Sequence, residues 1–259
     1  MMLKQVYKDY PRVQLKGKRV LDLGAHIGGF TNRAIDEGAS SVVAVEPWSE
    51  NYDLLQENVG HLPGVTLLKK AVTNHPTLMM TIGKPGSTGG VSGYIKRRPR
   101  PDTLVEVVDG VSFQTLLDTF KPEVVKMDIE GGEYEALPAD LEGVQQICGE
   151  LHTSSLENTQ KALDIIKWLE ANDFAVIFLR SSDRWRLMWL NFHAQHRRHC
   201  GKEMKGLTPF TMDGKLSRGE WAPNIEADWD HNRGWSTSGF INHTMGKRLL
   251  SVRTEWSKK

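Results

Sequence analysis

The chain has 259 residues, of which 39% are hydrophobic and 25% are charged, and its formal net charge is +1. This length supports one full hydrophobic core with material left over, and the near-zero charge excludes a whole-protein field that would steer the chain to nucleic acid or acidic membranes. Two cysteines are too few for a disulfide framework, and no apolar run is long enough for a signal peptide or a membrane span, so we expect a cytoplasmic globular protein.

Apolar stretches alternate with amphipathic stretches from residue 19 to residue 191. Strands are expected at residues 19–23, 41–47, 65–72, 123–130, 144–152, 174–180 and 185–192. Helices are expected at 28–37, 49–59, 112–120, 132–137 and 157–173, with Ser49 as the N-cap of the second helix. This order predicts an α/β fold with a doubly wound, seven-stranded and mostly parallel sheet of the Rossmann-like kind. The short turn between the last two strands makes them an antiparallel C-terminal hairpin.

Two regions do not follow this alternation. Residues 73–110 are expected to form an insert that holds a Gly/Ser-rich loop and a basic loop at 96–102. The residues from His193 onward are rich in glycine, tryptophan and charge, with weak periodicity. We therefore expect one main domain at 1–192, with the insert at 73–110, followed by an extension at 193–259.

The turn after the first strand, Gly24-Ala25-His26, lacks the second glycine of the dinucleotide fingerprint G-x-G-x-x-G. Asp22 ends that strand, where a carboxylate would repel a pyrophosphate but would suit a ligand that carries an ammonium group. Glu46 ends the second strand, at the position where an acid pairs with ribose hydroxyls. The combination predicts S-adenosylmethionine (SAM), which has a ribose and an ammonium group but no phosphate. The alternative is a turn whose glycines serve only close packing.

The segments VLDLGAHIGGFT and VVAVEP contain this turn and this acid, and VVKMDIEGGEYEAL and an E-x-H pair follow later in the chain. Together they resemble the FkbM-type family of class I SAM-dependent methyltransferases, over about residues 19–191. Gly132 stands where that family often has alanine. The resemblance implies methyl transfer from SAM, usually to a hydroxyl on a sugar or small molecule. It implies that the cofactor lies against Asp22, Gly24, Ala25, His26, Gly28, Glu46, Pro47, Ala71 and Asp128.

Ionisable side chains gather at the carboxyl ends of the fourth and fifth strands, where open α/β sheets bind ligands. Alternation places Lys126, Asp128 and Glu130 on one face of the fourth strand, and Glu150 and His152 on one face of the fifth. A hydroxyl acceptor must lose a proton, so His152 is the natural general base. Asp128 would orient the acceptor or act as a base itself, and Lys126 would balance the charge of the acids. These side chains are our catalytic candidates.

Metal binding is an alternative for two of these clusters. The acids and His152 could hold a divalent ion, which we do not favour because their spacing is set by the fold and not by a metal motif. His193, His196, His199 and Cys200 have a spacing that could bind zinc, but no second cysteine pair accompanies them, so we favour a solvated basic segment. We therefore expect no metal ligands.

The predicted function is SAM-dependent O-methylation of a hydroxyl on a carbohydrate or related small molecule, including an anionic one that the basic loop could bind. One alternative is an RNA methyltransferase that uses the basic loop and the tail aromatics. Others are an N-methyltransferase, which needs no strong base, and a SAM-binding module without turnover. We expect no membrane partner, and the tail tryptophans could close over the site as a lid.

Overall fold

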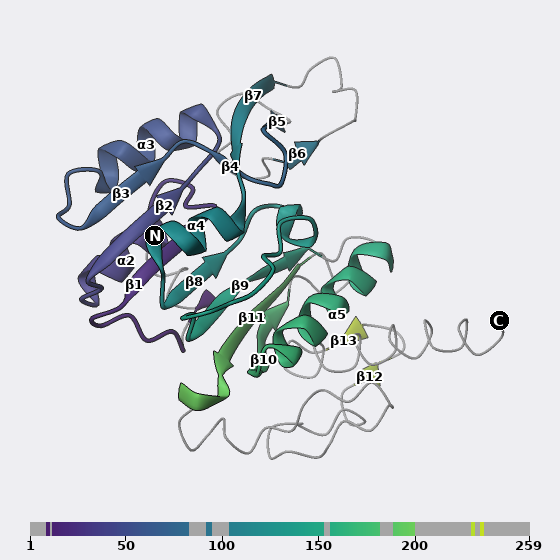
Figure 1. Cartoon of the computed structure of the whole chain (residues 1–259). Helices are drawn as coiled ribbons and strands as arrows, with labels where there is room; N and C mark the ends of the chain where they lie inside the picture. The colour runs from purple at the N-terminus through teal and green to yellow at the C-terminus, as the bar shows by residue number, and fades with distance from the viewer. Residues whose placement is uncertain are drawn as a thin grey trace. The chain divides into compact units, whose positions relative to one another are not determined.

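The computed structural model describes residues 9–10, 12–82, 92–94, 104–152, 156–181, 189–199, 229–230 and 234–235 (Figure 1). Its main sheet has seven strands in the order β10-β11-β9-β8-β1-β2-β3, which confirms the predicted α/β class and the mostly parallel, Rossmann-like topology. The chain divides into two compact units, Met1–Glu150 and Leu151–Lys259. The basic loop at 96–102 and most of the Trp-rich extension lie outside the described residues.

Five neighbouring strands of the main sheet pair in parallel (Figure 1). They are β1 (Arg19–Leu23), β2 (Ser41–Val45), β3 (Val65–Leu68), β8 (Val124–Met127) and β9 (Gln146–His152). The register pairs Asp22 with both Ala44 and Lys126, and Lys126 with Cys148. Because directly paired residues lie on the same face of a sheet, Asp22 and Lys126 face the same side.

Three helices accompany these strands: α2 (Gly29–Asp36), α3 (Ser49–Val59) and α4 (Phe113–Phe120). Helix α2 packs against β1, β2 and α3. The bounds of α3 are those predicted, but its N-cap is Trp48 and not Ser49. Ser49 is the first helical residue, and its backbone N–H donates to Glu106 Oε2 at 3.0 Å. A carboxylate that lies far away in the sequence thus satisfies a free N–H of the first turn, so the local pattern misplaced the cap.

The insert after β3 contributes to a second sheet, whereas the sequence analysis assigned no strands within residues 73–110. The predicted strand at 65–72 is divided into β3 and β4 (Ala71–Val72). Strand β4 joins β5 (Thr77–Ile82), β6 (Ser92–Tyr94) and β7 (Leu104–Val111) in the order β4-β7-β5-β6. Glycine-rich and basic stretches separate these strands in the sequence and concealed their pairing. The residues at 83–91 and 95–103 are not described.

Strand β8 ends at Met127, three positions before the predicted end at residue 130. Glu130 and Gly131 have φ angles of +55° and +98°, which strand geometry does not allow. The helix predicted at 132–137 is only a 3₁₀ turn, η1 (Gly132–Tyr134). Glu133 in that turn is fully buried, and its Oε1 accepts from the backbone N–H of Ile129 at 3.2 Å. Strand alternation therefore stops at Met127, and a buried carboxylate fixes the turn that follows.

The second unit contains α5 (Leu156–Ala171), β10 (Phe174–Ser181) and β11 (Trp189–His196), followed by η2 (Arg197–His199). Strands β10 and β11 are antiparallel, which confirms the predicted hairpin. Strand β11 runs past the domain boundary predicted at residue 192. It includes His193 and His196, which lie three residues apart and therefore point to opposite faces. Strand geometry thus separates two of the alternative zinc ligands. A two-stranded sheet, β12 (Trp229–Asp230) and β13 (Gly234–Trp235), completes the described part.

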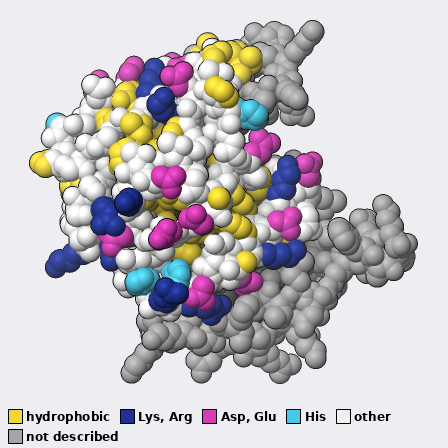
Figure 2. Space-filling model, viewed as in Figure 1, with side chains coloured by type: hydrophobic (Ala, Val, Ile, Leu, Met, Phe, Trp, Pro, Cys, Tyr) yellow, Lys and Arg dark blue, Asp and Glu magenta, His cyan; other side chains and the backbone are white. Residues whose placement is uncertain are grey.

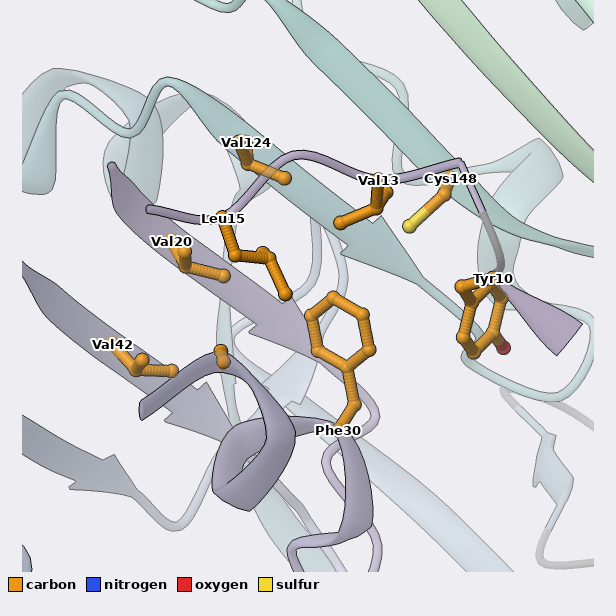
Figure 3. Packing of buried hydrophobic residues seen from close by; sticks show 9 residues of the cluster. Tyr10, Val13, Leu15, Val20, Phe30, Val42, Val124 and Cys148 are labelled. Atoms are coloured by element: carbon orange, nitrogen blue, oxygen red, sulfur yellow. The ribbon is translucent and has the colours of Figure 1, made fainter. Parts of the chain in front are cut away.

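An N-terminal segment at 12–15, together with Tyr10, packs on the first unit (Figure 3). Tyr10, Val13 and Leu15 are buried in one cluster with the α2 residue Phe30 and the β9 residue Cys148. The rest of the cluster consists of Val20, Ala34, Val42 and Val124. Part of the hydrophobic core of the first unit is therefore formed by residues that precede the strand–helix alternation.

Charged side chains of both signs are interspersed on the visible face of the described residues, as the near-neutral net charge suggests (Figure 2). Hydrophobic side chains also reach this surface between them (Figure 2). In the described portion of the chain, no helix combines the length and the apolar character needed to span a bilayer.

Candidate active site at the ends of β1, β2 and β8

The turn after β1 needs glycine at two positions. Gly24 has a φ of +74°, and a Cβ there would lie 1.8 Å from the carbonyl oxygen of Asp128. Gly28 has a φ of +94°, and its Cβ would press on Leu55 and Val59 of α3 at 3.0–3.1 Å. The backbone N–H groups of Gly24 and Ala25 donate to the carbonyl of Val45 at 2.9 and 3.0 Å. The turn is thus held between the ends of β2 and β8, and only glycine fits where it meets β8.

Asp22 is completely buried, with 0% of its surface exposed. Its Oδ2 accepts a hydrogen bond from Thr31 Oγ1 at 2.7 Å. Its Oδ1 lies 3.4 Å from Lys126 Nζ, and since this oxygen makes no hydrogen bond among the described residues, that contact is an ion pair only. The charge of Asp22 is therefore balanced within the protein. The sequence analysis expected Asp22 to meet the ammonium group of a ligand directly. Such an ammonium group would have to compete with Lys126 for this carboxylate.

Lys126 is buried at the centre of the site and touches both strand ends. Its Nζ donates to the carbonyl oxygens of Gly24 at 2.6 Å and Leu23 at 3.4 Å, and it lies 3.8 Å from Asp128 Oδ2. Burial alone would lower the pKa of this ammonium, but the carboxylates of Asp22 and Asp128 outweigh it and hold the pKa above its ordinary value. Lys126 is therefore a cation that joins β1 to β8, and it cannot serve as a general base.

Glu46 is buried directly after β2 and accepts hydrogen bonds from neutral groups. Its Oε2 accepts from the backbone N–H of His26 at 2.9 Å. Its Oε1 accepts from the backbone N–H of Trp48 at 3.1 Å and from Asn51 Nδ2 at 3.4 Å. Burial raises the pKa of Glu46 above its usual value, although these hydrogen bonds oppose the rise. Glu46 thus links the β1 turn to the start of α3.

Asp128 follows β8, and its backbone N–H still donates to the carbonyl of Leu23 at 3.1 Å. Its side chain is 26% exposed, unlike those of Asp22 and Glu46. Glu130, two residues further on, is exposed. Glu150 and His152 are half-buried and share one face of β9. Asp128 is therefore the acid next to Lys126 that can reach a ligand from the solvent side.

Pro47 and Ala71 are the remaining predicted cofactor residues. Pro47 is half-buried between Glu46 and Trp48. Ala71 lies on β4 and is buried in a cluster with Trp48, Met80 and Val108. Ala71 therefore belongs to the junction between the two sheets, next to the residue that caps α3.

The sequence analysis missed two side chains that contact the predicted acids. Thr31 in α2 donates to Asp22, and Tyr10 OH donates to Asp128 Oδ2 at 3.5 Å. Thr31 lies nine positions after Asp22, so it could have been found on the inner face of the first helix. Tyr10 lies 118 positions from Asp128, in a segment with no periodic pattern, and no sequence signal indicated it.

Residues 22–176 match the Methyltransferase FkbM domain, and this stretch includes the β1 turn, Glu46 and the whole β8 motif. The chain belongs to the FkbM methyltransferase family. This FkbM methyltransferase is accordingly a SAM-dependent enzyme, as the sequence motifs implied.

Individual proteins resemble this FkbM methyltransferase only at low sequence identity. Hexuronic acid methyltransferase AglP of Haloferax volcanii is 25% identical over 175 residues, which cover 60% of this chain and 68% of AglP. SMU.1697c of Streptococcus mutans, solved in complex with SAH, covers 75% of this chain and 97% of its own at 10% identity, with a TM-score of 0.46. Precorrin-6y C5,15-methyltransferase of Geobacter metallireducens covers 74% and 86% at 14% identity, with a TM-score of 0.42. The family assignment rests on the domain match.

Proposed function

We propose that this methyltransferase transfers the methyl group of SAM to a hydroxyl of a carbohydrate. The observation that carries the proposal is the contrast among three neighbouring acids. Asp22 and Glu46 are buried and bonded to protein groups, whereas Asp128 is partly exposed beside the glycine turn. An acid at that place can orient or deprotonate an acceptor, which a neutral amine acceptor would not need.

The β1 turn suits SAM because it is built around carboxylates and one closely packed glycine. A phosphate near Asp22 and Glu46 would add an anion beside two carboxyl groups, while a nucleoside with a cationic tail would not. The turn residues Gly24, Ala25, His26 and Gly28 would cradle SAM, with Glu46 and Pro47 at the ribose and Ala71 beyond them. When bound, SAM supplies an electrophilic methyl group on a sulfonium.

The residues of this chain would then remove the proton of the acceptor hydroxyl. Transfer forms an O–CH₃ bond, breaks the S–CH₃ bond and releases the hydroxyl proton. We assign that proton to His152, with Asp128 orienting the hydroxyl and Glu130 and Glu150 adding negative potential. Lys126 stays protonated and holds Asp128 near the turn. The carbohydrate class is supported by AglP, whose name specifies a hexuronic acid.

A transfer assay with methyl-labelled SAM tests the function. Oligosaccharides that contain hexuronic acid are compared with matched oligosaccharides of neutral hexoses, and with RNA. We expect labelled sugar whose methyl group survives mild alkali, because an ether is stable there and a methyl ester is not. Label only in RNA would refute the carbohydrate acceptor, and label only in alkali-labile form would refute the hydroxyl assignment.

Replacing the assigned base tests the chemistry. We expect His152→Ala to lower kcat by roughly 10²–10⁴-fold, since that is the usual worth of a positioned base, with little change in SAM affinity. His61→Ala, at an exposed position, is the matched control and should keep full activity. If His152→Ala keeps its kcat on a verified sugar acceptor, another group takes the proton.

A further inference from the structure

The starting point is the N-terminal segment, whose backbone is fastened to β9. The backbone N–H of Gln14 donates to Gln146 Oε1 at 3.0 Å, and Gln146 Nε2 donates back to the carbonyl of Gln14 at 3.0 Å. This reciprocal pair imitates one rung of a β ladder, with the amide side chain in place of a second backbone. The segment is therefore held in register over β9, and not only by hydrophobic contact.

Tyr10 is fastened separately, by α2. The buried guanidinium of Arg33 donates from Nη1 to the Tyr10 carbonyl at 2.8 Å. The Tyr10 ring packs edge-on against Phe30, with ring centroids 5.5 Å apart and an interplanar angle of 88°. Tyr10 is only 4% exposed. Backbone and ring are thus fixed by two helix residues, which leaves the hydroxyl little freedom to turn.

The hydroxyl of Tyr10 lies beside the carboxylate of Asp128. Tyr10 OH lies 3.5 Å from Asp128 Oδ2, the same oxygen that lies 3.8 Å from Lys126 Nζ. Burial, followed by the nearby charges of Asp128 and Glu150, raises the pKa of Tyr10 well above its usual value, so the phenol stays protonated and donates. Both contacts fall on Oδ2, and Oδ1 makes no hydrogen bond among the described residues.

We propose that Tyr10 is a positioning residue of the methyl-transfer site, which fixes the Asp128 carboxylate so that Oδ1 is presented to the acceptor. Tyr10 and Lys126 hold Oδ2 from two sides, one as a neutral donor and one as a cation. A carboxylate held by one oxygen keeps one rotamer, and a fixed orientation is what alignment of an acceptor requires. The inference rests on the role given to Asp128 in the proposed function.

A double-mutant cycle between Tyr10 and Asp128 tests the inference. We expect Tyr10→Phe, which removes only the hydroxyl, to lower kcat roughly 3- to 10-fold, the worth of one hydrogen bond, while SAM affinity stays the same. In an Asp128→Asn background the same substitution should change kcat less than 2-fold, because the group through which it acts is gone. Tyr52→Phe removes a phenol hydroxyl from α3 and is the matched control, with unchanged kcat.

A spectroscopic measurement reports the contact without an acceptor. In protein labelled with ¹³C at tyrosine Cζ, the signal of Tyr10 is identified by its loss in Tyr10→Phe. Asp128→Asn should move that signal and leave the other tyrosine signals in place. An unmoved signal would show that the hydroxyl does not bond to Asp128 and would overturn the inference.

The kinetic outcomes separate this inference from the proposed function. An equal effect of Tyr10→Phe in both backgrounds, or none in either, overturns the positioning role and leaves the role of Asp128 intact. Full activity of Asp128→Asn on its sugar acceptor overturns the role of Asp128 in the proposed function, and the positioning role with it.

Discussion

The ends of β1 and β2 each carry a buried acid, but the two acids are stabilised in different ways. Asp22 on β1 faces a cation, Lys126, and a hydroxyl. Glu46 after β2 faces two backbone N–H groups and an amide, all neutral. The pKa of Lys126 is raised by its carboxylates, whereas the pKa of Glu46 is raised by burial. The β1 end is therefore an ion pair that joins strands, and the β2 end is a hydrogen-bonded turn with an acid that ionises reluctantly.

Removing the cation should have the largest effect. Lys126→Met leaves Asp22 buried without its counter-charge, and we expect the free energy of unfolding to fall by about 3–5 kcal/mol. Urea denaturation measures it. Lys70→Met, which breaks the exposed pair with Asp109, is the matched control and should cost less than about 1 kcal/mol. Equal costs for the two variants would mean that the β1 end is not a buried ion pair. Adding Asp22→Asn to Lys126→Met should recover part of the loss.

A methyl group at the contact between the β1 turn and Asp128 should have the next largest effect. Gly24→Ala combines a positive φ with a Cβ 1.8 Å from the Asp128 carbonyl, and we expect a loss of about 2–5 kcal/mol. Gly17→Ala has nearly the same φ, +72°, with nothing within 4 Å of the added Cβ, so it should cost only about 1–2 kcal/mol. Thermal unfolding compares them. If both variants lose the same amount, backbone strain explains everything and the close contact with β8 contributes nothing.

The Glu46 end should respond to pH with the smallest effect. A carboxyl whose pKa is raised in the folded state binds its proton more tightly there, so its contribution to stability is largest below the unfolded pKa and is lost as pH rises through the folded pKa. Glu46→Gln cannot ionise. We expect the stability advantage of the wild type over this variant to shrink in urea titrations as the pH rises from about 4, near the ordinary pKa of a glutamate carboxyl, to neutral. A constant difference across that range would contradict the raised pKa.

The sequence was a good guide wherever a local pattern decided the structure. The bounds of α3, the β10–β11 hairpin and the glycine turn all follow from periodicity and turn chemistry. Prediction from the sequence failed where residues far apart in the chain determine the local structure. Glu106 on β7 satisfies the first N–H of α3. One failure is local: the buried carboxylate of Glu133 folds back on Ile129 and ends the β8 motif in a turn. Tyr10 reaches the site across 118 positions, which no window of sequence contains.

The reciprocal hydrogen bonds between Gln14 and Gln146 affect the reactivity of the Cys148 thiol. Cys148 lies in the cluster that Tyr10, Val13 and Leu15 cover, and burial raises the pKa of its thiol. While Tyr10 and residues 12–15 cover β9, the thiol of Cys148 is inaccessible and its raised pKa disfavours the reactive thiolate. A thiol reagent can react only after this segment separates from β9. The rate of Cys148 alkylation therefore measures how often Tyr10 and residues 12–15 separate from β9. The core of the first unit thus includes residues ahead of the family match, which begins at residue 22.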